Sequence, residues 1–134
     1  MPVQEDAFRQ QIKWANDIGK PLIIHCVRAY DKVLALLKEA RVPAIFHGFN
    51  KKMALAEKVL EQGHHLPVGA ALLSRQASIT EVIAMVPEDR FFLETDAAAV
   101  SIADVYQTTA LIRKTEVDTL ILQLQQNFKT VFGI

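Results

Sequence analysis

Three short segments of this sequence, each the end of an expected strand, finish on a residue that can bind a metal ion or move a proton. The runs "LIIH", "AIFH" and "LETD" end at His25, His47 and Asp96. Two imidazoles and a carboxylate are a common ligand set for zinc and other divalent first-row metals. A metal bound in this way lowers the pKa of a water ligand to about 7 and makes hydroxide available at neutral pH. If the three side chains converge, the chemistry they indicate is hydrolysis.

A fourth residue, Glu94, precedes Asp96 by two positions and would share its face of a strand. It can orient a metal ligand or carry a proton, and a salt bridge with a nearby arginine is an equal alternative. A histidine at the end of a strand is more often structural than catalytic when it stands alone. The candidate metal ligands are therefore His25, His47 and Asp96, and the candidate catalytic residues are Asp96 and Glu94.

Other reactive residue types have simpler explanations. His64 and His65 stand at the start of an expected strand, at the opposite end from the proposed site, and we interpret them as surface or packing residues. Cys26 is expected to be a small core residue. Lys51 and Lys52 follow the second run, where they face an anionic substrate or form the solvated start of a helix. No residue is assigned to substrate binding.

The elements that must position these side chains follow from hydrophobic periodicity. Alternating segments of strand and helix period run through the chain, and Trp14 and the phenylalanines are expected in the core. The expected strands span residues 22–26, 44–49, 65–69 and 90–96. The clearest helices span residues 5–18 and 31–40, and the expected N-caps of the later helices are Asn50, Ser78, Ser101 and Thr115.

This alternation predicts one α/β domain over residues 1–134 with a parallel sheet of four strands and right-handed crossovers. Pro67 cannot donate a ladder bond, so the third strand should lie at an edge or be distorted. Active sites in parallel α/β folds gather at the carboxyl ends of the strands. His25, His47 and Asp96 all lie at such ends.

Composition narrows the function classes further. The 134 residues carry 15 basic and 15 acidic side chains, so no basic field indicates non-specific coating of nucleic acid. The single cysteine excludes an internal disulfide and fits a reducing cytoplasm. We expect no signal peptide and no membrane association, because no apolar run approaches the roughly 20 residues that span a bilayer.

At these residues the sequence resembles the TatD family of metal-dependent hydrolases. The resemblance runs from "FRQQIKWANDIGKPLIIH" through "IFHGF" and "LETD" to "NFKTVF". It implies a TIM-barrel-like fold and hydrolysis of phosphodiesters, often in DNA, with divalent metals such as Zn, Mg or Mn. It also implies that His25 and His47 match metal histidines of the family, and that Asp96 matches a metal aspartate that helps to activate water.

The chain also departs from the family pattern. The H-x-H motif and the metal-bridging glutamate of the family have no counterpart, and "AAAVSI" replaces a "SPY"-like loop after "LETD". A closed barrel takes eight strands and roughly 250 residues, so four strands make about half. Two functions stay open: a hydrolase acting on a small phosphate ester or a DNA end, and a non-catalytic remnant that serves as a fold or self-assembly module. We expect a weak or empty metal site and a homo-oligomer formed through the open sheet edges.

Overall fold

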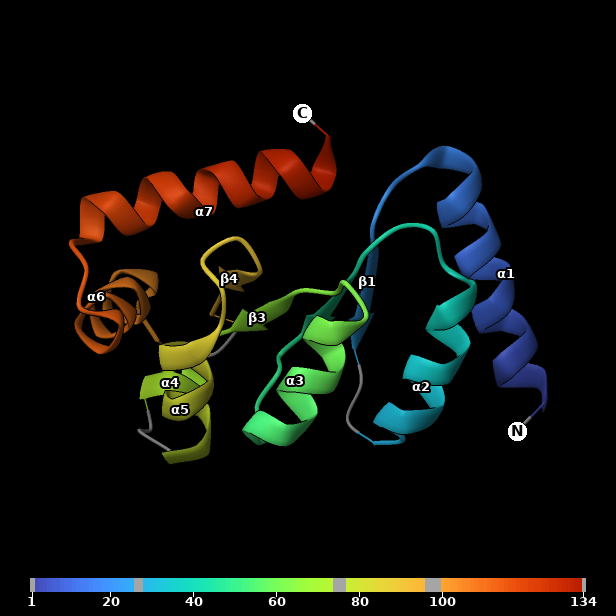
Figure 1. The fold of residues 1–134 in the computed structure, drawn as a ribbon, viewed down its shortest axis with the longest axis horizontal. Coiled ribbons are helices and arrows are strands. Elements are labelled where there is room, and N and C mark those ends of the chain that lie inside the picture. The colour runs from blue at the N-terminus through green and yellow to red at the C-terminus, as the bar shows by residue number, and fades with distance from the viewer. Residues whose placement is uncertain (1, 26–27, 74–76, 96–99, 134) are drawn as a thin grey trace.

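The computed structural model describes residues 2–25, 28–73, 77–95 and 100–133. Strands and helices alternate through most of this length, as expected (Figure 1). The strands are β1 (Leu22–His25), β2 (Ala44–His47), β3 (Leu66–Val68) and β4 (Phe91–Leu93). The helices are α1 (Pro2–Ile18), α2 (Tyr30–Leu36), the 3-10 turn η1 (Leu37–Glu39), α3 (Met53–Glu61), α4 (Ala70–Leu73), α5 (Ala77–Met85), α6 (Ile102–Arg113) and α7 (Val117–Phe132).

The strands form two parallel two-stranded sheets, β1-β2 and β3-β4, which one isolated bridge joins into a layer in chain order. β1 pairs with β2 and β3 pairs with β4, both in parallel. A single parallel bridge between Ile45 and His65 joins the two pairs, so the order is β1-β2-β3-β4. The register places His25 directly beside His47 at the carboxyl ends of β1 and β2. The predicted α/β class and parallel sheet are confirmed, and the described part of the chain does not close into a barrel.

Pro67 lies in β3, which among the described residues is an edge strand of the two-stranded β3-β4 sheet, so the expected edge position is confirmed. The expected distortion is present. The backbone amide of His65 donates to the Ala44 carbonyl, and the backbone carbonyl of His65 accepts from the Phe46 amide. The next bond in this parallel ladder would need an N–H at position 67, which proline lacks. The contact between β2 and β3 therefore shrinks to one bridge, while β3 keeps its ladder with β4.

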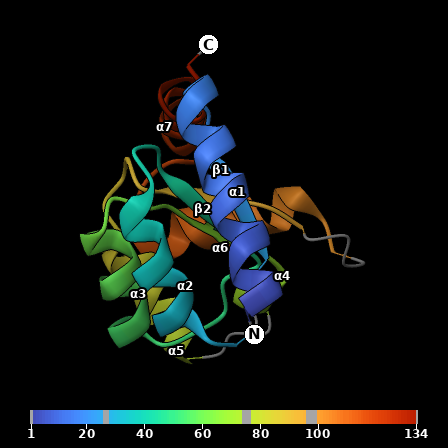
Figure 2. The ribbon, with the colours of Figure 1, turned by 90° about the vertical axis from the view of Figure 1, so that its right-hand side faces the viewer.

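Helices cover the outer face of the sheet. Phe46 of β2 is fully buried and stacks on Tyr30 of α2, with ring centroids 5.6 Å apart. Phe49 meets the same tyrosine edge-on at 6.1 Å. In Figure 2, α2 and α3 lie on one side of β1 and β2. Alternate residues of the strands point to the opposite, inner face, where Ile23 of β1 remains 66% exposed.

The last helix, α7, crosses the sheet at the amino ends of the strands (Figure 1). Asn127 donates to the carbonyls of Glu88 and Phe91, next to β4. At the far end of the helix, Lys20, two residues before β1, donates to the carbonyl of Phe132. The helix therefore covers the amino end of the sheet and leaves the carboxyl ends clear of it.

The start of β4 is held from two sides. From α6, Arg113 donates to the carbonyls of Ile83 and Val86, and its guanidinium lies 4.8 Å from the centre of the Phe91 ring. Burial lowers the pKa of Arg113. From α7, the side-chain amide of Asn127 donates to the Phe91 carbonyl, and this residue is only 2% exposed. These contacts fix β4 three residues before Glu94.

Several local predictions are wrong. Trp14 is 60% exposed and lies outside the core, because α1 turns Ile12 and Ala15 inward instead. Ser78 lies inside α5 and is not its N-cap. Lys52 caps α3 and Glu116 caps α7, in place of Asn50 and Thr115, and neither makes a side-chain cap bond within the described chain. The predicted cap Ser101 is confirmed, since its hydroxyl accepts from the amide of Ala103 at 3.2 Å.

No helix in the described segments is both long and apolar enough to span a bilayer.

Candidate active site

Two histidines form the centre of the candidate site at the carboxyl end of the sheet. Because β1 and β2 pair in register, the rings of His25 and His47 lie 5.9 Å apart between centroids, tilted by 49°. His25 is exposed, and the side chain of His47 is 35% exposed. Rings this close can bind the same ion. Two of the three side chains expected to converge therefore do so.

The carboxyl end of the sheet that carries His25 and His47 is called the histidine rim. Glu94, which directly follows β4, reaches this rim with its side chain. One of its carboxylate oxygens lies 2.7 Å from Nδ1 of His47, and the other accepts from the amide of Gly48 at 2.6 Å. Gly48, with φ of 71°, turns the chain just after β2 and presents its N–H to this carboxylate. The carboxylate side chain is only 19% exposed, so both bonds form in a largely dry environment.

The contact between Glu94 and His47 has a chemical consequence. A carboxylate only accepts hydrogen bonds, so Nδ1 of His47 must donate. In the neutral ring, this leaves the lone pair on Nε2, which is the form needed for a metal ligand. Metal-binding histidines are commonly oriented by a carboxylate in this way. The interpretation of Glu94 as the partner of a ligand fits this geometry.

Asp96, the expected third ligand and catalytic residue, lies outside the described residues, as does Cys26. Within the described segments, no group of three His, Cys, Asp or Glu side chains could hold a metal ion. The donor set present is therefore two adjacent imidazoles with one oriented by a carboxylate. These residues fit one side of a divalent metal site, and that site needs a further ligand from beyond them.

Lys51 and Lys52 follow the His47 rim, before α3 begins. Lys51 is half-buried and Lys52 is exposed. Both alternatives for this pair, a contact with an anionic substrate and a solvated helix start, remain predictions.

His64 and His65 lie before β3, at the amino end of the sheet, and take no part in this site. The prediction of surface positions is wrong and that of packing residues is confirmed, because they are only 3% and 7% exposed. Nδ1 of His64 accepts from the Ala44 amide at 2.9 Å. Burial, and secondarily the nearby charge of Arg90, lowers the pKa of each ring from 6.5 to about 4. Both rings are therefore neutral at pH 7.

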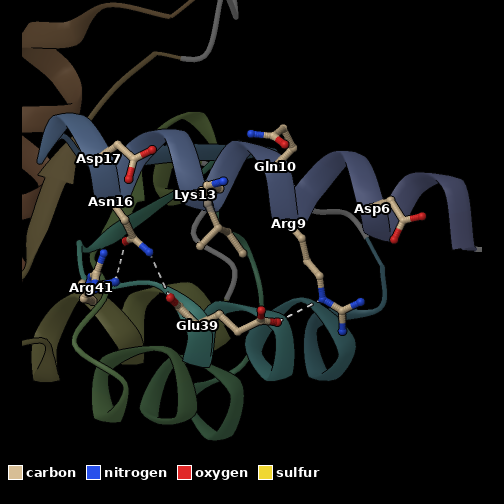
Figure 3. Close-up of a pocket in the computed structure, with 9 residues that line it drawn as sticks. Asp6, Arg9, Gln10, Lys13, Asn16, Asp17, Glu39 and Arg41 are labelled. Atoms are coloured by element: carbon tan, nitrogen blue, oxygen red, sulfur yellow. Dashed lines mark hydrogen bonds and ion pairs between the residues drawn. The ribbon is translucent and has the colours of Figure 1, made fainter.

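An open groove of about 450 Å³ lies elsewhere, along α1 (Figure 3). Its polar side chains bond to one another: Arg9 pairs with the Glu39 carboxylate at 3.1 Å, and Asn16 donates to the Glu39 carbonyl and accepts from the Arg41 amide. These bonds attach α1 to η1 and the start of the next loop. The groove therefore belongs to the outer helical layer and not to the histidine rim.

The family follows from comparison with known proteins. The chain matches the model of TatD related DNase over residues 1–133. The chain belongs to this family. It is 26% identical to the 3'-5' ssDNA/RNA exonuclease TatD of Erwinia amylovora, covering 96% of this chain and 58% of the relative. It is 28% identical to the uncharacterized metal-dependent hydrolase YjjV of Escherichia coli, covering 98% of this chain and 57% of the relative.

Solved TatD structures share the fold. The crystal structure of YjjV, a TatD homologue from Escherichia coli, superimposes with a TM-score of 0.83 at 26% identity, over 92% of this chain and 54% of the other. A TatD family hydrolase from Entamoeba histolytica gives 0.83 at 15% identity, over 98% of this chain and 57% of the other. The described sheet is therefore a part of the TatD barrel, and the chain spans little more than half the length of these relatives.

Two glycines at this rim were not singled out from the sequence. Gly48 supplies the amide that binds Glu94, and Gly69 lies where β4 passes closest to β3. The signal was present, because each glycine lies near the end of a predicted strand, where a glycine often marks a close approach of two backbones.

Proposed function

We propose that this chain carries the metal site of a TatD-type hydrolase that cleaves phosphodiesters with a metal-activated water. The observation that supports this most is the oriented histidine pair: His47, held by Glu94 through Nδ1, lies beside His25 at the carboxyl end of a parallel sheet. Imidazoles with a carboxylate behind them are the usual environment of a catalytic metal ion. A purely structural histidine pair would not need one ring fixed with its proton on Nδ1 and its lone pair on Nε2.

The proposed roles are as follows. His25 and His47 hold a divalent ion, Zn²⁺, Mg²⁺ or Mn²⁺. Asp96, two residues beyond Glu94, supplies the third ligand and accepts a proton from the nucleophilic water. Glu94 keeps Nδ1 of His47 protonated. When bound, the ion lowers the pKa of its water ligand and polarises the phosphoryl oxygen.

The proposed substrate is a small phosphate ester or the end of a DNA strand. The name of one relative, a 3'-5' ssDNA/RNA exonuclease, supports a nucleic-acid substrate. The net charge of zero gives little general attraction to a long duplex. Recognition would therefore depend on local contacts at the rim, such as the one that Lys51 and Lys52 could make with a phosphate.

A second candidate function is a non-catalytic module that assembles through its sheet edges. The observation that favours it is the donor set, because no three His, Cys, Asp or Glu side chains of the described segments come together to hold a metal ion. The H-x-H and glutamate ligands that the resemblance implies for the family have no counterpart in the sequence. On this alternative the histidine rim persists without enough ligands for turnover.

Hydrolysis of a chromogenic phosphodiester in the presence of Mg²⁺, Mn²⁺ or Zn²⁺ separates the two candidates. For the hydrolase, we expect metal-dependent turnover that falls at least about 100-fold in His25→Ala and His47→Ala, since each loses a ligand to the ion. Glu57→Gln, an exposed change on α3, is the matched control and should retain activity. Turnover that survives the loss of His25, or a parent without turnover under any metal, would overturn this proposal.

A further inference from the structure

Glu94 contacts His47 across an intervening strand. Glu94 follows β4, and His47 ends β2, with β3 between them. Neighbouring strands lie about 4.8 Å apart, so the side chains of Glu94 and His47 must together span roughly two strand spacings. They meet with a carboxylate oxygen of Glu94 2.7 Å from Nδ1 of His47. Such a reach requires that nothing on the end of β3 block the path.

The residue at that point is Gly69, directly after β3. A Cβ atom built on Gly69 would lie 2.3 Å from the carbonyl oxygen of Glu94, 3.0 Å from its carbonyl carbon and 3.2 Å from its Cγ. The first two contacts are with backbone, which cannot rotate out of the way. The backbone of Gly69 is not in the left-handed region, unlike that of Gly48. The close approach alone therefore requires a glycine here.

The position of Glu94 depends on this approach. Its amide donates to the Val68 carbonyl at 3.0 Å, so its backbone lies directly against the end of β3. A methyl group at position 69 would push the Glu94 backbone away from β3. The carboxylate would then move away from Nδ1 of His47 together with the backbone that carries it.

We propose that Gly69 is a positioning residue of this rim: the absence of its side chain lets Glu94 reach His47 and fix the ring with its proton on Nδ1. The importance of Gly69 for catalysis rests on the proposed function, because only a metal ligand needs an unprotonated Nε2 on His47. The contacts among Gly69, Glu94 and His47 all lie within the described residues. Their effect on the His47 ring can be measured without metal and without substrate.

The test is the tautomer of His47, measured by ¹⁵N NMR of the four imidazoles in the full chain without metal, with His47 assigned from a His47→Gln sample. In the parent we expect the proton on Nδ1. In Gly69→Ala the Nδ1–H form should fall to about half, because the ring loses its fixed acceptor. In Glu94→Gln the side-chain amide can donate to Nδ1, so the proton should move to Nε2.

Gly63→Ala is the matched control. Gly63 has a positive φ of 88° and open space around its Cβ position, so this change costs stability without a contact near the rim. Its His47 signal should match that of the parent. If Gly63→Ala and Gly69→Ala changed the tautomer equally, a general loss of stability would explain the result and the proposal would be wrong.

The remaining outcomes are also decisive. A folded Gly69→Ala protein that keeps the parent tautomer overturns the proposal. If this variant stays unfolded even in trimethylamine N-oxide, which favours compact states, Gly69 is a folding requirement and the positioning claim is again wrong. A parent with the expected tautomer but no metal-dependent hydrolysis would leave the role of Gly69 intact and remove the proposed function. Metal-dependent hydrolysis by the parent, together with a parent-like His47 tautomer in Gly69→Ala, would support the proposed function and overturn the role of Gly69.

Discussion

The carboxylate of Glu94 joins two strand ends that the sheet alone leaves apart. It accepts from the Gly48 amide and from Nδ1 of His47, at 2.6 and 2.7 Å. The hydrogen bond from the Gly48 amide holds the carboxylate in place, and the hydrogen bond with Nδ1 orients the imidazole of His47. Since both bonds end on one side chain, changes to that side chain should alter metal binding without removing a metal ligand.

Glu94→Gln is expected to weaken Zn²⁺ binding by roughly 10–100-fold, the usual cost of losing a carboxylate behind a ligand histidine. The amide can still accept from Gly48, so the fold should hold, but its NH₂ group favours the wrong tautomer of His47. Isothermal titration calorimetry with Zn²⁺ measures the effect, and Glu57→Gln serves as the control. Equal affinities for Glu94→Gln and the parent would show that Glu94 does not support a ligand.

The buried pair His64 and His65 predicts how stability depends on pH. Each ring has a pKa of about 4 in the folded chain and 6.5 when unfolded. Between these values the unfolded chain binds more protons than the folded one, so the free energy of unfolding falls as pH falls. The loss begins near pH 6.5, is complete below about pH 4, and amounts to about 3 kcal/mol for each ring.

Urea denaturation at a series of pH values measures this dependence. His64→Asn is the informative variant, because the asparagine oxygen can accept from the Ala44 amide as Nδ1 of His64 does but does not titrate. It should remove about half of the loss between pH 6.5 and 4. Lys38→Gln, at an exposed position, should leave the dependence unchanged. A parent whose stability is level over this range would contradict the prediction.

At the scale of elements, α7 positions the site from a distance. Asn127 is buried on α7 and donates to the carbonyls of Glu88 and Phe91, which lie just before and at the start of β4. Glu94 follows on the same strand. The "NFKTVF" motif, which is part of the family resemblance, therefore has a structural role here: its asparagine attaches the last helix to the strand that Glu94 directly follows.

Asn127→Ala should lower the free energy of unfolding by about 1–3 kcal/mol, because the buried bond to the Phe91 carbonyl and the half-buried bond to the Glu88 carbonyl are both lost. Gln126→Ala, one position away and exposed, should change it by less than about 0.5 kcal/mol. Urea denaturation followed by circular dichroism compares the two variants. Similar losses for both would mean that the carbonyl contacts of Asn127 contribute little.

The sequence predicted the elements with strong periodicity and missed what depends on contacts between distant segments. Runs such as "LIIH" and "AIFH" gave correct strands and the pairing of His25 with His47, because parallel strands in register bring their carboxyl ends together. The exposure of Trp14 was missed, since an apolar residue type does not show which face of a helix packs against the rest of the chain, and here Ile12 and Ala15 form that face. The close approach of Gly69 to Glu94 was missed because a glycine in a predicted strand does not reveal which backbone lies close to it.

At the scale of the whole molecule, the described sheet has two end strands, β1 and β4, each with one strand partner among the described residues. The β1 side also exposes apolar side chains: Ile23 of β1 is 66% exposed, and Trp14 and Ile18 of α1 are 60% and 69% exposed. Unpaired edges with apolar neighbours favour association. In the TatD structures that share this fold, the aligned region is 54–57% of the chain.

We propose that a second copy of the chain covers these edges. All four strands run in parallel, so a two-fold axis along the sheet direction would bring β1 of one copy beside β4 of the other, twice and with parallel pairing. Two copies would then supply the eight strands that a closed barrel needs. In that arrangement both histidine rims face the same end of the barrel, and each copy would border the site of the other.

A change at Ile23 tests this assembly, because the side chain lies on the edge strand and is exposed in a single copy. Light scattering after size-exclusion chromatography should give about 30 kDa for the parent, twice the 15.0 kDa of one chain. Ile23→Glu should shift the mass to that of one chain while circular dichroism stays the same, since a charge at the edge opposes strand pairing. Leu122→Glu, at a position 67% exposed on α7, should leave the parent mass unchanged. A parent that elutes as a monomer and melts cooperatively would show that the half-barrel is stable with its edges open, and assembly would then play no part in completing the site.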